Sequence, residues 1–238
     1  MGTLAEELQE ELTVQYMTFD VGGYEIQISE SVIVTWVIML ILVLISIFLT
    51  RNLKVNNISK RQAVAELLVT KCESFVTGMI GEEGKAYVPY LMTVLIYIGL
   101  SNMIGMFDMK LFGAALKPPT KDLNVTAALA LMSIILIQYA SIHKRGVGGW
   151  LKSFSQPVAI VTPINILELV IRPLSLCLRL FGNILGAFTI MELIKMAMPV
   201  GLPAIFSLYF DLFDGAIQAY IFVFLTSLFI KEAIETEE

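Results

Sequence analysis

The sequence contains little charge and almost no cysteine. Of its 238 residues only 16% are charged and 57% are hydrophobic, which is typical of membrane proteins and unlike soluble domains. A soluble enzyme is therefore not expected. The two cysteines, Cys72 and Cys177, are too few for a disulfide framework and too far apart in sequence for a metal site. We interpret both as small apolar side chains and expect no metal.

Basic residues and phosphate-binding motifs are scarce as well. The pI is about 5.0, and because nucleic acids require a basic surface, we expect no nucleic-acid partner. The segment Gly81-Glu-Glu-Gly84-Lys85 resembles a phosphate-binding loop only superficially, since its spacing is wrong and no Ser or Thr follows. We therefore predict neither a nucleotide site nor a cofactor, and no enzyme activity of this chain on its own.

Long apolar segments are abundant instead. A spanning helix needs about 20 apolar residues, and the uncharged runs 31–50, 86–107 and 123–142 reach that length. Two further spans, at about 153–198 and 204–230, are predicted around a turn at 199–203. The segment 58–80 has apolar residues at helical spacing among charged ones, which predicts an amphipathic helix on the membrane surface. The predicted fold class is an all-α integral membrane protein with five transmembrane helices and one interfacial helix.

Lys and Arg residues predict the orientation, because positively charged loops stay in the cytoplasm. The segment after the first span carries Arg51, Lys54, Lys60 and Arg61, and the loop after the third carries Lys144, Arg145 and Lys152. The first 30 residues hold seven acids and no Lys or Arg. We therefore expect residues 1–30 outside, a single membrane domain over 31–232, and a cytoplasmic tail at 233–238.

A polar stripe interrupts the fourth span. Its members lie three or four positions apart: Asn165, Glu168, Arg172, Ser175, Arg179, Asn183 and Gly186. At about 100° per residue they share an arc of about 80° on one helix face. Ionisable residues in hydrophobic spans cost about 3 kcal/mol each and usually mark ion pathways. Glu168 and Arg172 could equally form an ordinary salt bridge near the cytoplasmic end. Arg179 lies about 10 Å deeper and requires a facing carboxylate or a watery cavity, because arginine keeps its charge.

A second polar stripe lies on the last span. Ser207, Asp211, Asp214 and Gln218 fall within about 60° of one another on a helix. Counted outward from the turn, Gln218 is level with Asn183, whereas Asp211 and Asp214 lie nearer the outside. The two stripes are thus offset along the membrane normal, which favours two half-passages over a straight pore. Gly182 and Gly186 lie beside the first stripe and predict a face that another helix can approach closely.

Several motifs together resemble subunit a of F-type ATP synthases. They are Arg179-Leu-Phe-Gly-Asn183, preceded by Arg172-Pro-Leu-Ser175 and followed by Ile217-Gln218-Ala-Tyr-Ile-Phe, with Asn102-Met-Ile-Gly105, Pro119-Thr-Lys-Asp122 and Lys144-Arg-Gly146-Val-Gly-Gly149 elsewhere. The resemblance covers roughly residues 30 to 232.

The resemblance implies an ion-translocating stator beside a ring of c subunits, with the last two helices forming a long tilted hairpin next to that ring. It implies further partners in the peripheral-stalk b subunits and the rest of the synthase. Arg179 would face the ion-carrying carboxylates of the ring, whether the ion is H⁺ or Na⁺. Asn183 and Gln218 match polar positions near this arginine. Asp211, with Asp214, would serve the outer half-channel, and Glu168 and Ser175 are candidates for the cytoplasmic one. A bacterial plasma membrane is expected.

Two other functions fit the composition. A secondary ion-coupled transporter would also place charge at mid-membrane, but such folds usually show inverted repeats and broken helices, and no internal repeat is visible in this sequence. A purely structural membrane anchor has no use for two facing polar stripes.

Overall fold

The structure is a computed structural model that describes residues 16–21, 24–56, 58–104, 110–111, 114–115, 117–156, 158–198, 201, 206 and 208–235. The chain divides into two compact units. The first comprises Met1–Met39, Tyr97–Thr126 and Leu178–Ala219, and the second comprises Leu40–Ile96, Ala127–Cys177 and Tyr220–Glu238.

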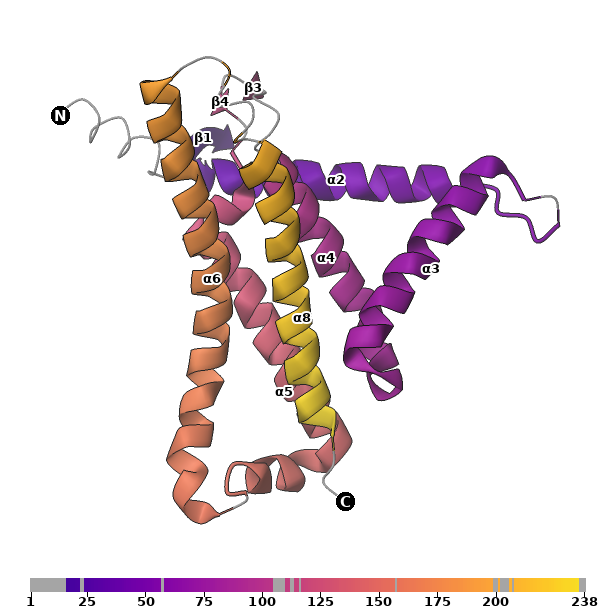
Figure 1. Cartoon of the computed structure of the whole chain (residues 1–238), viewed down its shortest axis with the longest axis vertical. Helices are drawn as coiled ribbons and strands as arrows, with labels where there is room; N and C mark the ends of the chain where they lie inside the picture. The colour runs from indigo at the N-terminus through magenta and orange to yellow at the C-terminus, as the bar shows by residue number, and fades with distance from the viewer. Residues whose placement is uncertain are drawn as a thin grey trace. The chain divides into compact units, whose positions relative to one another are not determined.

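Helices form wherever the sequence is continuously apolar, because a helix satisfies its own backbone groups without water. The long helices are α2 (Glu30–Thr50), α4 (Val88–Met103), α5 (Leu123–Ser153), α6 (Thr162–Ala197) and α8 (Gly215–Ile234) (Figure 1). A 3₁₀ segment, η1 (Glu82–Tyr87), precedes α4. Within the described residues, five helices are long and apolar enough to cross a membrane. The predicted fold class, with five spans, is therefore confirmed.

The bounds of two helices differ from the prediction. α5 continues to Ser153 across a kink at Gly146, whose φ is +70°. α6 begins at Thr162, after a short 3₁₀ turn η4 (Ala159–Val161). Gly201, in the predicted turn, has a φ of +87°; its neighbours 199–200 and 202–203 lie outside the described residues.

The first unit contains two short antiparallel hairpins that the sequence reasoning did not predict. β1 (Tyr16–Val21) pairs with β2 (Tyr24–Ser29), with Tyr16 opposite Ser29 and Val21 opposite Tyr24. β3 (Lys110–Leu111) pairs with β4 (Ala114–Ala115). Two glycines, residues 22 and 23, separate β1 from β2 in the sequence and lie outside the described residues.

The core of the first unit includes a close contact between α4 and the start of α8. The Asn102 side chain donates to the Gly215 carbonyl at 3.0 Å and accepts from the Thr120 hydroxyl at 2.7 Å. Thr120 lies in η3 (Pro119–Lys121), just before α5, and is fully buried. A Cβ at Gly215 would come within 2.8 Å of the Asn102 Cβ, so glycine permits this approach.

The second unit packs α3 (Lys60–Ile80) and parts of α2, α4, α5, α6 and α8. α3 begins at the N-cap Ser59, whose hydroxyl accepts from the Gln62 amide, and ends at Gly81 with φ +83°. Fully buried apolar side chains of this unit include Ile80, Leu91, Ile137, Val223 and Ile230. The aromatic rings of Phe75 and Tyr220 pack 5.7 Å apart, joining α3 to α8. The helix at 58–80 is therefore present; its place on a membrane surface stays a prediction.

Candidate functional site

The polar stripe on α6 has two halves with different surroundings. In its first half Asn165, Glu168 and Arg172 are all half-buried and have partners. The Asn165 amide donates to the Phe154 carbonyl at 2.9 Å and to the Gln156 carbonyl at 3.2 Å. Arg172 Nη2 donates to Glu168 Oε2 at 2.6 Å. The ordinary salt bridge that the spacing allowed for Glu168 and Arg172 is therefore present.

Arg172 has a second carboxylate partner on α8. The same Nη2 lies 2.7 Å from Glu232 Oε1, and the guanidinium stacks 4.8 Å from the centre of the Phe229 ring. One cation thus lies between two acids, Glu168 and Glu232, that are far apart in the sequence. Sequence reasoning missed Glu232, because helical spacing reveals neighbours within one helix only.

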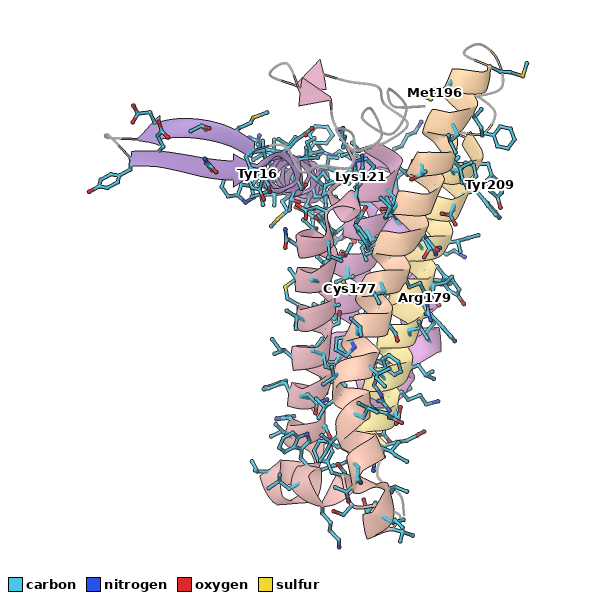
Figure 2. The ribbon with its side chains drawn as sticks, turned by 90° about the vertical axis from the view of Figure 1, so that its left-hand side faces the viewer. Tyr16, Lys121, Cys177, Arg179, Met196 and Tyr209 are labelled. Atoms are coloured by element: carbon cyan, nitrogen blue, oxygen red, sulfur yellow. The ribbon has the colours of Figure 1, made fainter. Side chains whose placement is uncertain are left out.

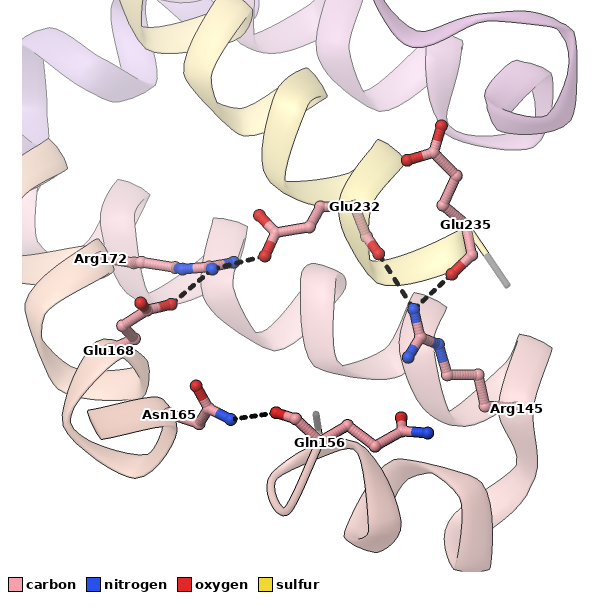
Figure 3. A network of polar contacts seen from close by, with 7 residues as sticks. All are labelled: Arg145, Gln156, Asn165, Glu168, Arg172, Glu232 and Glu235. Atoms are coloured by element: carbon pink, nitrogen blue, oxygen red, sulfur yellow. Dashed lines mark hydrogen bonds and ion pairs between the residues drawn. The ribbon is translucent and has the colours of Figure 1, made fainter. Parts of the chain in front are cut away.

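Arg145 binds the end of α8 from the kinked part of α5. Its Nε donates to the Ala233 carbonyl at 3.2 Å, and its Nη2 donates to the Glu232 carbonyl at 3.1 Å and to the Glu235 carbonyl. The Glu232 and Ala233 carbonyls belong to the last turn of α8, which ends at Ile234, and the last carbonyls of a helix have no partner within it. Figure 3 shows Arg145 and Arg172 approaching Glu232 through different atoms, one through its carbonyl and the other through its carboxylate.

The network borders a cavity of about 330 Å³ within the second unit. Its polar lining includes Gln138, Arg145, Trp150, Asn165, Glu168 and Glu232. Trp150 Nε1 donates to the Gln138 amide oxygen at 2.8 Å, which satisfies two of these groups. A polar cavity of this size holds several water molecules.

In the second half of the stripe the side chains are exposed. Ser175, Arg179 and Asn183 all lie on the exposed face of α6. Cys177, two positions from Arg179 and about 200° away around the helix, is buried (Figure 2). Among the residues that the structure describes, the Arg179 guanidinium makes no hydrogen bond or ion pair. A positive charge on a spanning helix therefore faces outward from the chain.

The glycines beside Arg179 leave this face open. Gly182 is exposed and Gly186 is half-buried. A Cβ added at either position would meet no atom within 4 Å. Glycines with open space around them allow a neighbouring helix backbone to come close.

The second stripe begins in an irregular segment before α8. Asp211 and Asp214 lie in the π-helical segment η5 (Leu208–Asp214), a conformation that frequently occurs at functional sites. Gln218, which is 5% exposed, donates to Asp214 Oδ1 at 3.4 Å. Ser207 and the side chain of Asp211 lie outside the described part of the structure, so their predicted roles rest on sequence alone.

The structure thus brings together some predicted residues and not others. Asp214 pairs with Gln218, and Glu168 pairs with Arg172. No hydrogen bond in the described part of the chain joins Arg179 to Asn183 or Gln218. The residues that sequence reasoning missed are Glu232, as the partner of Arg172, and Arg145, which was used only for orientation. The sequence offered one signal that could have linked Arg145 to Glu232. The charge rule predicts that Arg145 and the carboxyl terminus lie on the same side of the membrane.

Comparison with known proteins extends over both stripes. A family model described as ATP synthase A chain matches residues 32–231. A relative from Moorella thermoacetica, named ATP synthase subunit a, is 37% identical over 210 residues, covering 88% of this chain and 92% of the relative. One from Propionigenium modestum, named ATP synthase subunit a, sodium ion specific, is 31% identical over 226 residues, covering 91% of this chain and 78% of the relative. A third, ATP synthase subunit a 2 from Bradyrhizobium, is 33% identical, covering 92% of this chain and 93% of the relative.

Proposed function

Because the chain belongs to the ATP synthase A chain family, we propose that the stripes on α6 and α8 form two offset half-channels serving a ring of c subunits. The chain is subunit a of an F-type ATP synthase, a multi-pass membrane protein and the ion-translocating stator of the complex. It is not catalytic alone. The secondary-transporter and anchor alternatives are therefore not retained.

The exposed Arg179 is the observation that carries the proposal. Its guanidinium lies on a spanning helix and finds no partner within the described chain. A charge in that position is costly unless something outside the chain neutralises it. A ring carboxylate satisfies the requirement, because a nearby cation favours the ionised carboxylate. Each carboxylate then releases its ion before passing Arg179 and reloads afterwards, and the fixed positive charge blocks a direct leak between the half-channels.

The outer half-channel is proposed to use Asp211, Asp214 and Gln218, with Asn183 near its inner end. The hydrogen bond from Gln218 to Asp214 supports this assignment, because it aligns two polar groups in an otherwise apolar helix. The π-helical segment that holds both aspartates also supports it.

The cytoplasmic half-channel is proposed to use Glu168 and Ser175. Glu168 borders the polar cavity of about 330 Å³, which supports contact with water. Its carboxylate forms an ion pair with the Arg172 guanidinium. In this role Glu168 acts chiefly as a fixed negative charge that attracts cations to the cavity. Ser175 lies two turns further along α6 and is exposed.

The partners proposed from the family are the c-subunit ring, the peripheral-stalk b subunits and the lipid bilayer. For the ring, Gly182 and Gly186 support close approach on the face that carries Arg179, since no atom fills the space beside them.

The coupling ion is H⁺ or Na⁺. One relative is named as sodium ion specific, so the ion requirement is measured directly in the experiment below.

The proposed orientation places the amino terminus outside a bacterial plasma membrane and the carboxyl terminus in the cytoplasm. Two contacts of the second unit support it. Arg145 binds carbonyls of the last turn of α8, and Lys144 lies 3.3 Å from Glu83 at the start of the second span. Both contacts join segments for which the charge rule predicts the same side.

The test is ion-driven ATP synthesis in vesicles that contain the assembled complex, with and without added Na⁺. Arg179→Ala should abolish synthesis while assembly persists, because the separator between the half-channels is removed. Arg51→Ala removes an exposed arginine outside the stripes and serves as the matched control, with synthesis expected to stay near the native rate. Synthesis that survives in Arg179→Ala vesicles would overturn the proposal.

A further inference from the structure

The ends of three helices meet at one residue, Glu232, in the last turn of α8. Its carbonyl accepts from Arg145 in the kinked part of α5, and its carboxylate accepts from Arg172 on α6 (Figure 3). Neither arginine belongs to the exposed half of the stripe that carries Arg179. These groups belong to the second unit and adjoin Glu168, which is assigned to the cytoplasmic half-channel, but that assignment gives no role to Glu232, Arg145 or Arg172.

The Arg145 contacts act on the backbone of α8. Three carbonyls of the helix end, those of Glu232, Ala233 and Glu235, accept from one guanidinium. A cation at a helix carboxyl terminus also interacts favourably with the helix dipole. Because these contacts are made to backbone carbonyls, they hold the end of α8 independently of its side chains.

The backbone around Arg145 is shaped to present it. Gly146 has a φ of +70°, which breaks the regular course of α5 directly after Arg145 and favours glycine. At Gly149 an added Cβ would lie 3.0 Å from the Arg145 Cβ. Two glycines thus permit the turn and the packing that direct Arg145 to α8.

The Arg172 contacts act on the Glu232 side chain. The guanidinium is bonded to Glu168 at 2.6 Å and to Glu232 at 2.7 Å, and it stacks on Phe229. Its side chain is 22% exposed. A partly buried arginine with two carboxylates and an aromatic ring is held in one geometry, unlike a mobile surface pair.

We propose that Glu232, Arg145 and Arg172 form a clamp, here called the Glu232 clamp, that fixes the end of α8 to α5 and α6. They are positioning residues for ion transfer, not ion carriers. The clamp fixes the end of α8 beside the polar cavity that Glu168 borders within the second unit, so it sets the position of α8 relative to that cavity. A rotating ring exerts a lateral force on the stator. A helix held at its end by both backbone and side-chain contacts resists that force. The proposal rests on the proposed stator function.

The experiment uses the assembled complex in inverted vesicles and measures ions pumped per ATP hydrolysed, with the amount of assembled chain determined in parallel. Glu232→Ala should keep hydrolysis and lower the pumping ratio to less than about half of native, because a charge-assisted contact is lost. Glu232→Arg should lower it further by repulsion from Arg172. The double exchange Arg172→Glu with Glu232→Arg should restore most of the ratio.

The neighbouring Lys231 provides the matched control. It is exposed, and its side chain makes no hydrogen bond or ion pair within the described part of the chain. Lys231→Ala should therefore pump as the native complex does. Glu232→Gln preserves the side-chain shape and a hydrogen-bond acceptor, so it should keep most of the ratio and remains informative if Glu232→Ala does not assemble.

Two results would overturn the clamp. The first is an unchanged pumping ratio in well-assembled Glu232→Arg vesicles, and the second is a double exchange no better than the single one. If Glu232→Gln loses as much pumping as Glu232→Ala, and the double exchange does not restore it, Glu232 is instead an ion carrier. Arg179→Ala in the same preparation separates the two proposals. If it still pumps, the stator mechanism fails; if it does not pump and the exchange fails to rescue, only the clamp fails.

Discussion

At the residue scale, the strength of the Arg172 contacts can be compared with the work done on the stator. A hydrogen bond to a charged group contributes about 1.5–3 kcal/mol when well protected, and an exposed ion pair contributes about 0–1 kcal/mol. The Glu232 side chain is 58% exposed, so the energy of its bond with Arg172 should lie toward the range for exposed pairs. An ion descending 100 mV releases about 2.3 kcal/mol. The contact is therefore weaker than the work of one ion transfer, and its loss should cause slippage without unfolding.

Gly215 is the residue at which a single methyl group should matter most. In Gly215→Ala the new Cβ would lie 2.8 Å from the Asn102 Cβ, and overpacking of this kind costs about 1–3 kcal/mol. We expect a lower melting temperature of the purified complex and a weaker hydrogen bond from Asn102 to the residue 215 carbonyl. Gly78→Ala on α3 is the control, since a Cβ there meets nothing within 4 Å. An equal melting temperature for the two variants would contradict the close approach.

At the scale of elements, α6 is one helix with two roles. Before Pro173 its polar residues bind α8 and the segment after α5, and after Pro173 they face outward. Helical spacing placed all seven residues on one face, but it could not distinguish these halves. The difference arises from what packs against each part of the helix.

The kink in α5 provides a prediction at the same scale. Gly146→Ala places a side chain at φ +70°, which is unfavourable by about 1 kcal/mol or more. Relaxing this strain would move Arg145 away from the end of α8. The number of ions pumped per ATP hydrolysed should therefore fall, as it should when Arg145 is itself replaced by alanine. Gly148→Ala is the control, because a Cβ there meets open space. Native pumping in Gly146→Ala vesicles would show that the kink does not position Arg145.

At the scale of the whole molecule, the proposed orientation with five spans predicts that the two termini lie on opposite sides of the membrane. A cysteine introduced at Lys144 should react with a membrane-impermeant thiol reagent only from the cytoplasmic side, because positively charged loops remain there. The background combines Cys72→Ser and Cys177→Ser, and a cysteine at exposed Tyr24 in β2 should react only from outside. Labelling of position 144 in intact cells would reverse the proposed orientation.

Much of the molecule could be predicted from the sequence. Uncharged length predicted three of the spans, and overall apolarity with a turn at 199–203 predicted the other two, because the helix satisfies its own backbone groups in lipid. The Arg179-to-Asn183 motif was sufficient to indicate the family. The β1–β2 hairpin escaped prediction because its short alternating strands carry a weak signal beside the long apolar runs. The roles of Asp211 and Ser207 remain sequence-based predictions.

The sequence by itself therefore determined what repeats along the chain: the spans, the polar stripes, and the Glu168–Arg172 pair four residues apart. Only the tertiary structure decided which stripe residues have partners. Glu232 lies 60 positions from Arg172 and Arg145 lies 87 positions from Glu232, beyond any helical period. Their contacts depend on how α5, α6 and α8 end beside one another in the second unit. Arg179 has no such neighbour within the described chain, and its proposed partner is a carboxylate of the c-subunit ring.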